Sequence, residues 1–282
     1  MTKTNKLGLL AWNRTLTQVT VYALLVGAYG ALAVIKENSQ YKDVGDTPSD
    51  VHAGLTLVLG ALLVFRTNSA YSRWWEARTL WGGLVNCCRN LSVKVSRLVE
   101  LPADARNDFR KLIGAFPYVL MDHLRGDSSL ERIQGLIEHH AALHHVPSAL
   151  VAKLYADVGR LKREGRIDGD ELRVLDIELR SLLDICGGCE RIRNTRIVRS
   201  YRIFSRQCVL LYLATFPWGI VQDFRAWTIP LTAISAYFMI GMETVAEHIE
   251  DPFGDDEDDL DLDALCSTIE RSVTEIFQRG PV

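Results

Sequence analysis

The densest group of side chains able to do chemistry lies near the C-terminus, where a run of carboxylates extends from Glu250 to Asp263. A turn of the sequence Pro252-Phe253-Gly254 interrupts this run. Clustered carboxylate oxygens can wrap a hard cation such as calcium. The spacing and the glycine position exclude an EF-hand. A solvated acidic turn without an ion is the other interpretation, and these residues alone leave both open.

A second group of candidate ligands consists of four histidines close in sequence: His139, His140, His144 and His145. His140 and His144 share a helix face at a spacing of four, and Glu138 is nearby, so zinc binding is chemically possible. Surface histidines ahead of Pro147 are the commoner explanation of such a pattern.

Catalytic motifs are missing from the sequence. Cys186-Gly-Gly-Cys189 has the spacing of a redox motif, but that chemistry needs a strand-to-helix turn that the surrounding sequence does not provide. We expect the pair to serve helix packing. The sequence contains no Ser-His-Asp set, Walker loop or dinucleotide fingerprint. The protein is therefore not expected to be an enzyme or to require a cofactor, and a formal charge of −3 argues against nucleic acid as a partner.

The elements that must position these residues include long apolar runs. Four segments are uncharged: Gln18–Ile35, Val51–Phe65, Gln207–Gln222 and Ala226–Met242. A spanning helix needs about 17–25 apolar residues, which the first and last segments meet while the other two are marginal. Because the segments form two pairs, each joined by a short polar loop, two transmembrane hairpins are favoured over a soluble bundle. The mean hydropathy of +0.04 reflects a charged stretch between the pairs.

The distribution of basic residues predicts the orientation of these segments. Basic residues follow the second segment at Arg66, Arg73 and Arg78, and a further cluster precedes the third. The positive-inside rule then places both termini and the middle region in the cytosol, with the protein spanning the inner (plasma) membrane several times. The predicted parts are residues 1–65, with the first two spans; 66–206, a cytosolic helical region; 207–246, with the last two spans; and 247–282, a cytosolic acidic segment. We expect no cleaved leader, since Met1–Arg14 leads into the first run without a small-residue cleavage pattern.

The second span is predicted to continue beyond the membrane. No glycine or proline occurs between Ala61 and Trp81, so one helix can extend to about Glu100. The middle region, Pro102–Ile203, should form further helices broken at Pro102, at Pro147 and near Gly165–Gly169. No useful alternating strand pattern is present. The sequence thus predicts an all-α membrane protein.

Three stretches resemble the bestrophin family. Phe65–Gly82 resembles the signature after the second transmembrane helix of bestrophins, while Cys189–Thr195 and Glu250–Asp259 lie where the family has its other motifs. The resemblance covers nearly the whole chain in order, and the sequence is identified as similar to bacterial bestrophins.

This resemblance implies a homopentamer in the lipid bilayer, with four transmembrane helices per subunit around a central pore and a cytosolic vestibule. Three rings of a hydrophobic neck map onto Leu57, Ala61 and Phe65, and helical periodicity independently places these residues on one face. Ala61 departs from the bulky apolar residue usual in the family, which implies a wider or wetter neck.

The resemblance also implies two further sites. A second constriction near the cytosolic exit maps loosely onto Leu175, with Ile177 as the next candidate. The calcium clasp of animal bestrophins maps its side-chain ligands onto Asp251, Asp256 and Asp259, so calcium is a possible ligand.

The function implied is passive flow of small monovalent ions through the neck. The ion is either an anion such as chloride or a cation such as sodium. Acidic residues near the presumed exit lean slightly towards cations: Asp170, Glu171, Asp176 and Glu178. The alternative function is that of a non-conducting membrane scaffold or regulatory protein.

Overall fold

The structure is a computed structural model that describes residues 14–42, 48–127, 134–137, 144–256 and 258–278. All secondary structure in these residues is helical, which confirms the predicted all-α class. In chain order the elements are α1 (Arg14–Glu37), α2 (Ser49–Leu98), α3 (Ala103–Arg125), α4 (Val146–Arg163), α5 (Gly169–Asn194), α6 (Arg199–Phe224), the 3-10 helix η3 (Arg225–Trp227), α7 (Thr228–Ile249) and α8 (Leu262–Gln278).

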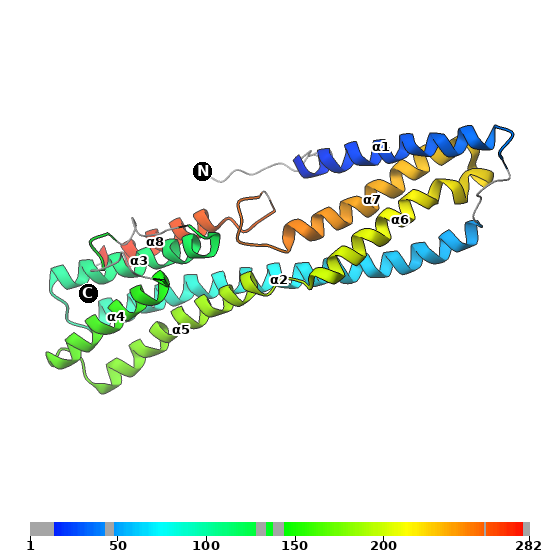
Figure 1. The fold of residues 1–282 in the computed structure, drawn as a ribbon. Coiled ribbons are helices and arrows are strands. Elements are labelled where there is room, and N and C mark those ends of the chain that lie inside the picture. The colour runs from blue at the N-terminus through cyan, green and yellow to red at the C-terminus, as the bar shows by residue number, and fades with distance from the viewer. Residues whose placement is uncertain (1–13, 43–47, 128–133, 138–143, 257, 279–282) are drawn as a thin grey trace. The chain divides into compact units, whose positions relative to one another are not determined.

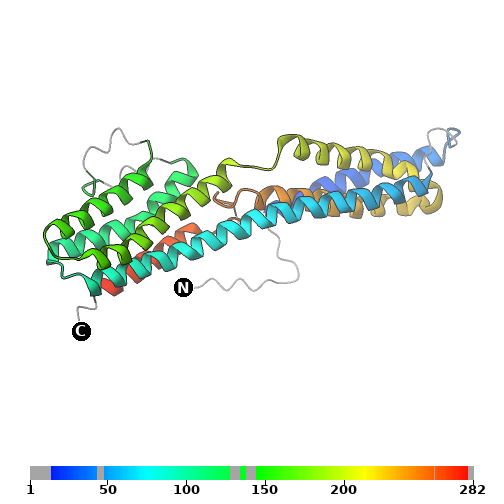
Figure 2. The ribbon, with the colours of Figure 1, turned by 90° about the horizontal axis from the view of Figure 1, so that it is seen from below.

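Helix α2 is a single uninterrupted helix of 50 residues, as Figure 2 shows. The prediction that the second apolar run continues to about Glu100 is confirmed, with the helix ending at Leu98. The chain divides into two compact units, and α2 contributes to both because the boundary falls after Ser72. Unit 1 comprises α1, the first part of α2, α6, η3 and α7, whereas unit 2 comprises the rest of α2 with α3, α4, α5 and α8.

The closest packing in unit 1 joins α1 to α7, which lie side by side in Figure 1. A Cβ atom added at Gly27 would lie 2.7 Å from the Cβ of Ala233, so the two backbones approach as closely as glycine permits. Gly30 similarly faces Thr232. Residues from four helices form the apolar core of this unit: Ala23, Leu59, Leu63, Val209, Tyr212, Leu213, Ala236 and Met239.

Three helical segments are long and apolar enough to cross a membrane: Thr15–Glu37, Ser49–Leu98 and Arg199–Ile249. The last of these contains α6 and α7 joined by η3. All three lie wholly or partly in unit 1. The compact units divide the chain after Ser72, Arg196 and Glu250, whereas the borders after residues 65, 206 and 246 concern the membrane and stay a prediction.

Unit 2 packs α3 against α8 and α4 against α5, as Figure 1 shows. Its core buries Trp81 and Leu84 of α2 together with Phe116 of α3. The predicted helix breaks are confirmed: Pro102 precedes α3, Pro147 lies in the first turn of α4, and α4 and α5 are separated near Gly165. Gly165 has a φ of +72°, a left-handed conformation that favours glycine.

Candidate functional site

The three predicted neck residues lie on the exposed side of α2 within unit 1. The side chains of Leu57 and Phe65 are 78% and 68% exposed, and Ala61 between them is also exposed. Leu59 and Leu63, on the opposite side of the helix, are buried in the core of the unit. Large apolar side chains exposed in this way need lipid or another protein surface to cover them.

An apolar hollow lies between α2 and α6, next to the same face. Ala61 and Phe65 line it from α2, and Phe204 and Leu211 line it from α6. The side chain of Phe65 therefore lies both on the exposed face of α2 and beside α6.

A buried charge network lies immediately after the neck residues. The guanidinium of Arg66 is fully buried, with Nε 2.8 Å from Oε2 of Glu243 and Nη2 3.9 Å from Oε2 of Glu250. Glu243 is 7% exposed and Glu250 is 3% exposed. The network therefore pairs one buried cation of α2 with two buried carboxylates at the C-terminal end of α7.

Further contacts tie α6 into this network. The Ser205 hydroxyl donates to Glu243 Oε2 at 3.2 Å, and Arg206 Nε lies 3.2 Å from Glu243 Oε1. The backbone amide of Ile197 donates to Glu250 at 3.1 Å. This network was not predicted from the sequence, in which Arg66 marked the orientation of the second span. The signal available was that Arg66 and Glu243 each follow an apolar run directly.

The two candidates for the cytosolic constriction differ sharply in exposure. Leu175 is fully buried in the core of unit 2, on the α5 face that also carries Leu179 and Leu182. Ile177 is 60% exposed. Ile177 is therefore the more accessible of the two residues, and the identity of the constriction stays a prediction. The repeat of apolar residues along α5 was the sequence signal for the burial of Leu175.

The acidic turn is partly neutralised by arginines in unit 2. Asp251 pairs with Arg196 at 2.7 Å. Arg125 pairs with Asp255 at 2.8 Å and donates to the carbonyl of Gly254. Arg125 also pairs with Asp263 at 3.2 Å, so two arginines offset part of the negative charge of the acidic run.

Asp259 closes this turn through its own carboxylate. Its Oδ2 accepts the backbone amide of Asp256 at 2.7 Å. A Cβ atom at Gly254 would lie 2.5 Å from the same oxygen, so any larger residue there would displace the carboxylate of Asp259. Oδ1 of Asp259 is buried without a hydrogen-bond partner among the residues that the structure describes. Burial raises the pKa of Asp259 to about 6, the amide of Asp256 opposes this, and the charges of Asp256 and Asp251 add to it.

The cysteine pair and part of the histidine group are placed by the structure. Cys186 and Cys189 are buried in α5, and burial, reinforced by the charge of Glu190, raises the pKa of the Cys186 thiol to about 12. Such thiols are poor nucleophiles at neutral pH. His139 and His140 lie outside the described residues. His145 meets His123 and Glu190, two partners that the sequence analysis missed because they come from other helices.

Comparison with known proteins gives one consistent result. Residues 5–275 match the family described as bacterial and fungal bestrophin proteins. A voltage-dependent anion channel-forming protein of Mesorhizobium japonicum is 34% identical over 230 residues, covering 80% of this chain and 74% of its own length. A protein of the same description from Synechocystis is 34% identical over 235 residues, covering 80% and 76%.

The chain is also similar in structure to proteins whose structures have been solved. One structure of a bacterial bestrophin homologue from Klebsiella pneumoniae superposes with a TM-score of 0.87 at 25% identity, covering 92% of this chain and 99% of that one. A second structure of that homologue gives 0.86 at 24% identity, covering 94% and 99%.

Proposed function

This chain belongs to the bacterial and fungal bestrophin family, and on that premise we propose that it forms a homopentameric channel for small monovalent anions such as chloride. The observation that carries the proposal is the similarity, over about four-fifths of the chain, to proteins described as voltage-dependent anion channel-forming. The exposed apolar face of α2 supports it, because a shared axis would cover that face. Passive flow past rings of apolar side chains is the mechanism.

In the proposed assembly α1, α2, α6 and α7 each cross the inner (plasma) membrane, with both termini in the cytosol. Leu57, Ala61 and Phe65 of α2 form the neck. Ile177, which is exposed on α5, is the candidate for the cytosolic constriction.

Acidic residues that suggested cation conduction in the sequence have ion-pair or hydrogen-bond partners in unit 2. Glu178 is 8% exposed and pairs with Lys94 at 2.8 Å. Asp176 accepts a hydrogen bond from the Tyr155 hydroxyl at 2.8 Å, and the carboxylate of Glu171 accepts the amide of Asp168 in the capping box of α5. Lys94 neutralises Glu178, whereas hydrogen bonds leave Asp176 and Glu171 charged, so the argument for cations is weakened at one of the four positions.

Recording across planar bilayers tests the proposal. The purified protein should have the mass of five copies in detergent and should carry current, with a reversal potential that follows the chloride gradient when chloride salts are asymmetric. Replacing chloride by a large organic anion should reduce the current, whereas replacing sodium by a large organic cation should not. A reversal potential that follows sodium would reject anion selectivity. A folded pentamer without current would instead favour the scaffold or regulatory function.

We also infer that the acidic turn binds calcium. Asp256 and Asp259 supply adjacent carboxylates, and the buried Oδ1 of Asp259 gains the partner that it lacks among the described residues. Asp251 would join them on release from Arg196. A bound cation would also offset the mutual repulsion of these carboxylates.

Calcium should therefore raise the melting temperature of the protein, by about 2–4 °C for each kcal/mol of binding free energy. Asp259→Asn should abolish this rise and, without calcium, should melt slightly higher than the unaltered protein near neutral pH because a repelled charge is gone. Asp255→Asn, which changes an exposed acid of the same turn, should keep the calcium effect. An unaltered protein that melts identically with calcium and with chelator would show that the turn binds none.

A further inference from the structure

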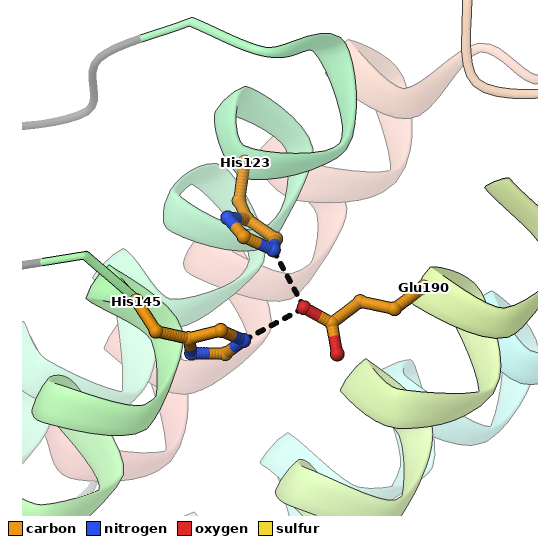
Figure 3. A group of neighbouring side chains, drawn as sticks. All are labelled: His123, His145 and Glu190. Carbon is orange, nitrogen blue, oxygen red and sulfur yellow. Dashed lines mark hydrogen bonds and ion pairs between the residues drawn. The ribbon is translucent and has the colours of Figure 1, made fainter. Parts of the chain in front are cut away.

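Three helices of unit 2 bring two imidazoles to one carboxylate. His123 lies in the last turn of α3, His145 caps the N-terminus of α4, and Glu190 lies in α5. Figure 3 shows the three side chains pointing toward one another, with Nε2 of each histidine 2.7 Å from the same oxygen, Oε1 of Glu190. The three ligand atoms all lie within 4.8 Å of one another.

The charge and access of this cluster suit a small cation. Burial alone would raise the pKa of Glu190, but hydrogen bonds from His123 and His145, together with their charge, outweigh it and lower the pKa, so the group is a carboxylate at neutral pH. The side chains are 22%, 37% and 28% exposed for His123, His145 and Glu190, which leaves a path from solvent. The guanidinium of Arg193, a nearby positive charge, donates a hydrogen bond to the backbone carbonyl of His123 at 2.7 Å.

We propose that His123, His145 and Glu190 form a binding site for Zn²⁺. Two imidazoles and one carboxylate are a common zinc ligand set that leaves a fourth, open position for water. Imidazole nitrogen favours zinc and similar transition metals over calcium or magnesium, which prefer oxygen. This site is separate from the acidic turn and from the neck, and it does not depend on ion conduction.

Zinc fits between these atoms after a small movement. Ligands about 2.0–2.1 Å from a tetrahedral zinc ion lie about 3.3 Å apart, so each nitrogen-to-oxygen distance must widen by roughly 0.6 Å. The C-terminal end of α3 and the N-terminal end of α4 hold the histidines, and the ends of helices move more easily than their middles.

Zinc binding must also displace the protons that the two Nε2 atoms carry. Each Nε2–H donates to Glu190, and zinc requires the Nε2 lone pair, so each of these protons must move to Nδ1 or pass to solvent. Nδ1 of His145 accepts the amide of Ser148 at 3.1 Å, so zinc binding exchanges this cap of α4 for a metal bond. The same cluster without zinc would be a hydrogen-bonded link between helices, and the two arrangements differ in measurable ways.

Isothermal titration calorimetry tests the proposal. The full-length protein in detergent is titrated with zinc chloride near neutral pH. We expect one saturable zinc per chain. His145→Gln and Glu190→Gln, which nearly conserve side-chain size, should each weaken zinc binding more than 100-fold, beyond what the loss of an outer partner usually costs. His123→Ala should do the same. Co²⁺ in place of zinc should give the intense visible absorption of tetrahedral coordination, and this absorption should vanish in the same variants.

Two matched variants separate this site from its neighbours. His144→Ala removes the exposed histidine next to His145, and Asp259→Asn alters the acidic turn; both should bind zinc as the unaltered protein does. Melting temperatures in chelator establish which variants fold. If His123→Ala does not fold, zinc binding by Glu190→Gln and His145→Gln tests the proposal. Absence of saturable zinc binding, or binding that persists in Glu190→Gln and His145→Gln, would overturn the proposal and leave a hydrogen-bonded link.

Discussion

Replacing Glu243 with alanine should lower the free energy of unfolding by about 3–5 kcal/mol, since it leaves a buried arginine without its nearest partner. Arg66 is fully buried, and its Nε lies 2.8 Å from Glu243, whereas the second carboxylate, Glu250, is 3.9 Å away. Removing one member of a buried ion pair costs far more than the pair itself contributes, because the remaining charge keeps its desolvation penalty. Unfolding in mixed detergent micelles, followed by circular dichroism, measures the change.

Two comparisons identify the cause of this loss. Glu247 pairs with Arg206 one turn further along α7 but is 44% exposed, so Glu247→Ala should cost only about 0–1 kcal/mol. The triple variant Arg66→Met, Glu243→Met and Glu250→Gln removes all three buried charges of the network and should recover most of the loss. A cost below about 1 kcal/mol for Glu243→Ala would show that Arg66 is satisfied elsewhere in the assembly.

The second large effect is expected in the neck. Phe65→Ala should increase the single-channel conductance or open probability on the order of tenfold, which corresponds to a barrier lowered by about 1.4 kcal/mol. Ala61→Phe should reduce the current by a similar factor. Both follow from dewetting in the proposed pentamer, in which five bulky apolar side chains around the axis would exclude water and five alanines would admit it. Recordings of single channels in planar bilayers measure both variants.

Leu55→Ala is the matched control for the neck, because Leu55 is also apolar and 43% exposed but lies about 160° around the helix from Leu57 and about 120° from Ala61. It should leave the current unchanged. If folded Phe65→Ala channels conduct as the unaltered channels do, then Phe65 does not face the pore and instead fills the hollow beside Phe204. In that case the truncation should reduce stability by about 3–5 kcal/mol, the usual cost of removing a buried aromatic ring.

The parts of the fold that depend on local sequence were predictable. The course of α2 followed from the absence of glycine and proline between Ala61 and Trp81. The breaks at Pro102 and Pro147 followed from the restrictions that proline places on a helix. The common face of the neck residues followed from helical periodicity alone, whereas their role came from the resemblance and stays a prediction.

Pairings between distant helices were not predictable in the same way. Arg66 meets Glu243, and His123 meets Glu190, only because the helices pack in one particular arrangement. No local pattern records which charge lies opposite which. The burial of Leu175 is different, because its place on the apolar stripe of α5 could be read from the sequence.

The continuity of α2 restricts how genes for such proteins can diverge. Each residue inserted in a helix rotates everything beyond it by about 100°, so one extra residue between Phe65 and Trp81 would put the buried positions after it, such as Trp81 and Leu84, out of phase with the helical pattern before it. An insertion of seven residues, close to two full turns, would nearly restore the phase but would lengthen the helix by about 10 Å. Point substitutions preserve both phase and length, whereas insertions and deletions are tolerated far better in surface loops. Homologues should therefore differ along α2 in side chains and hardly ever in residue count.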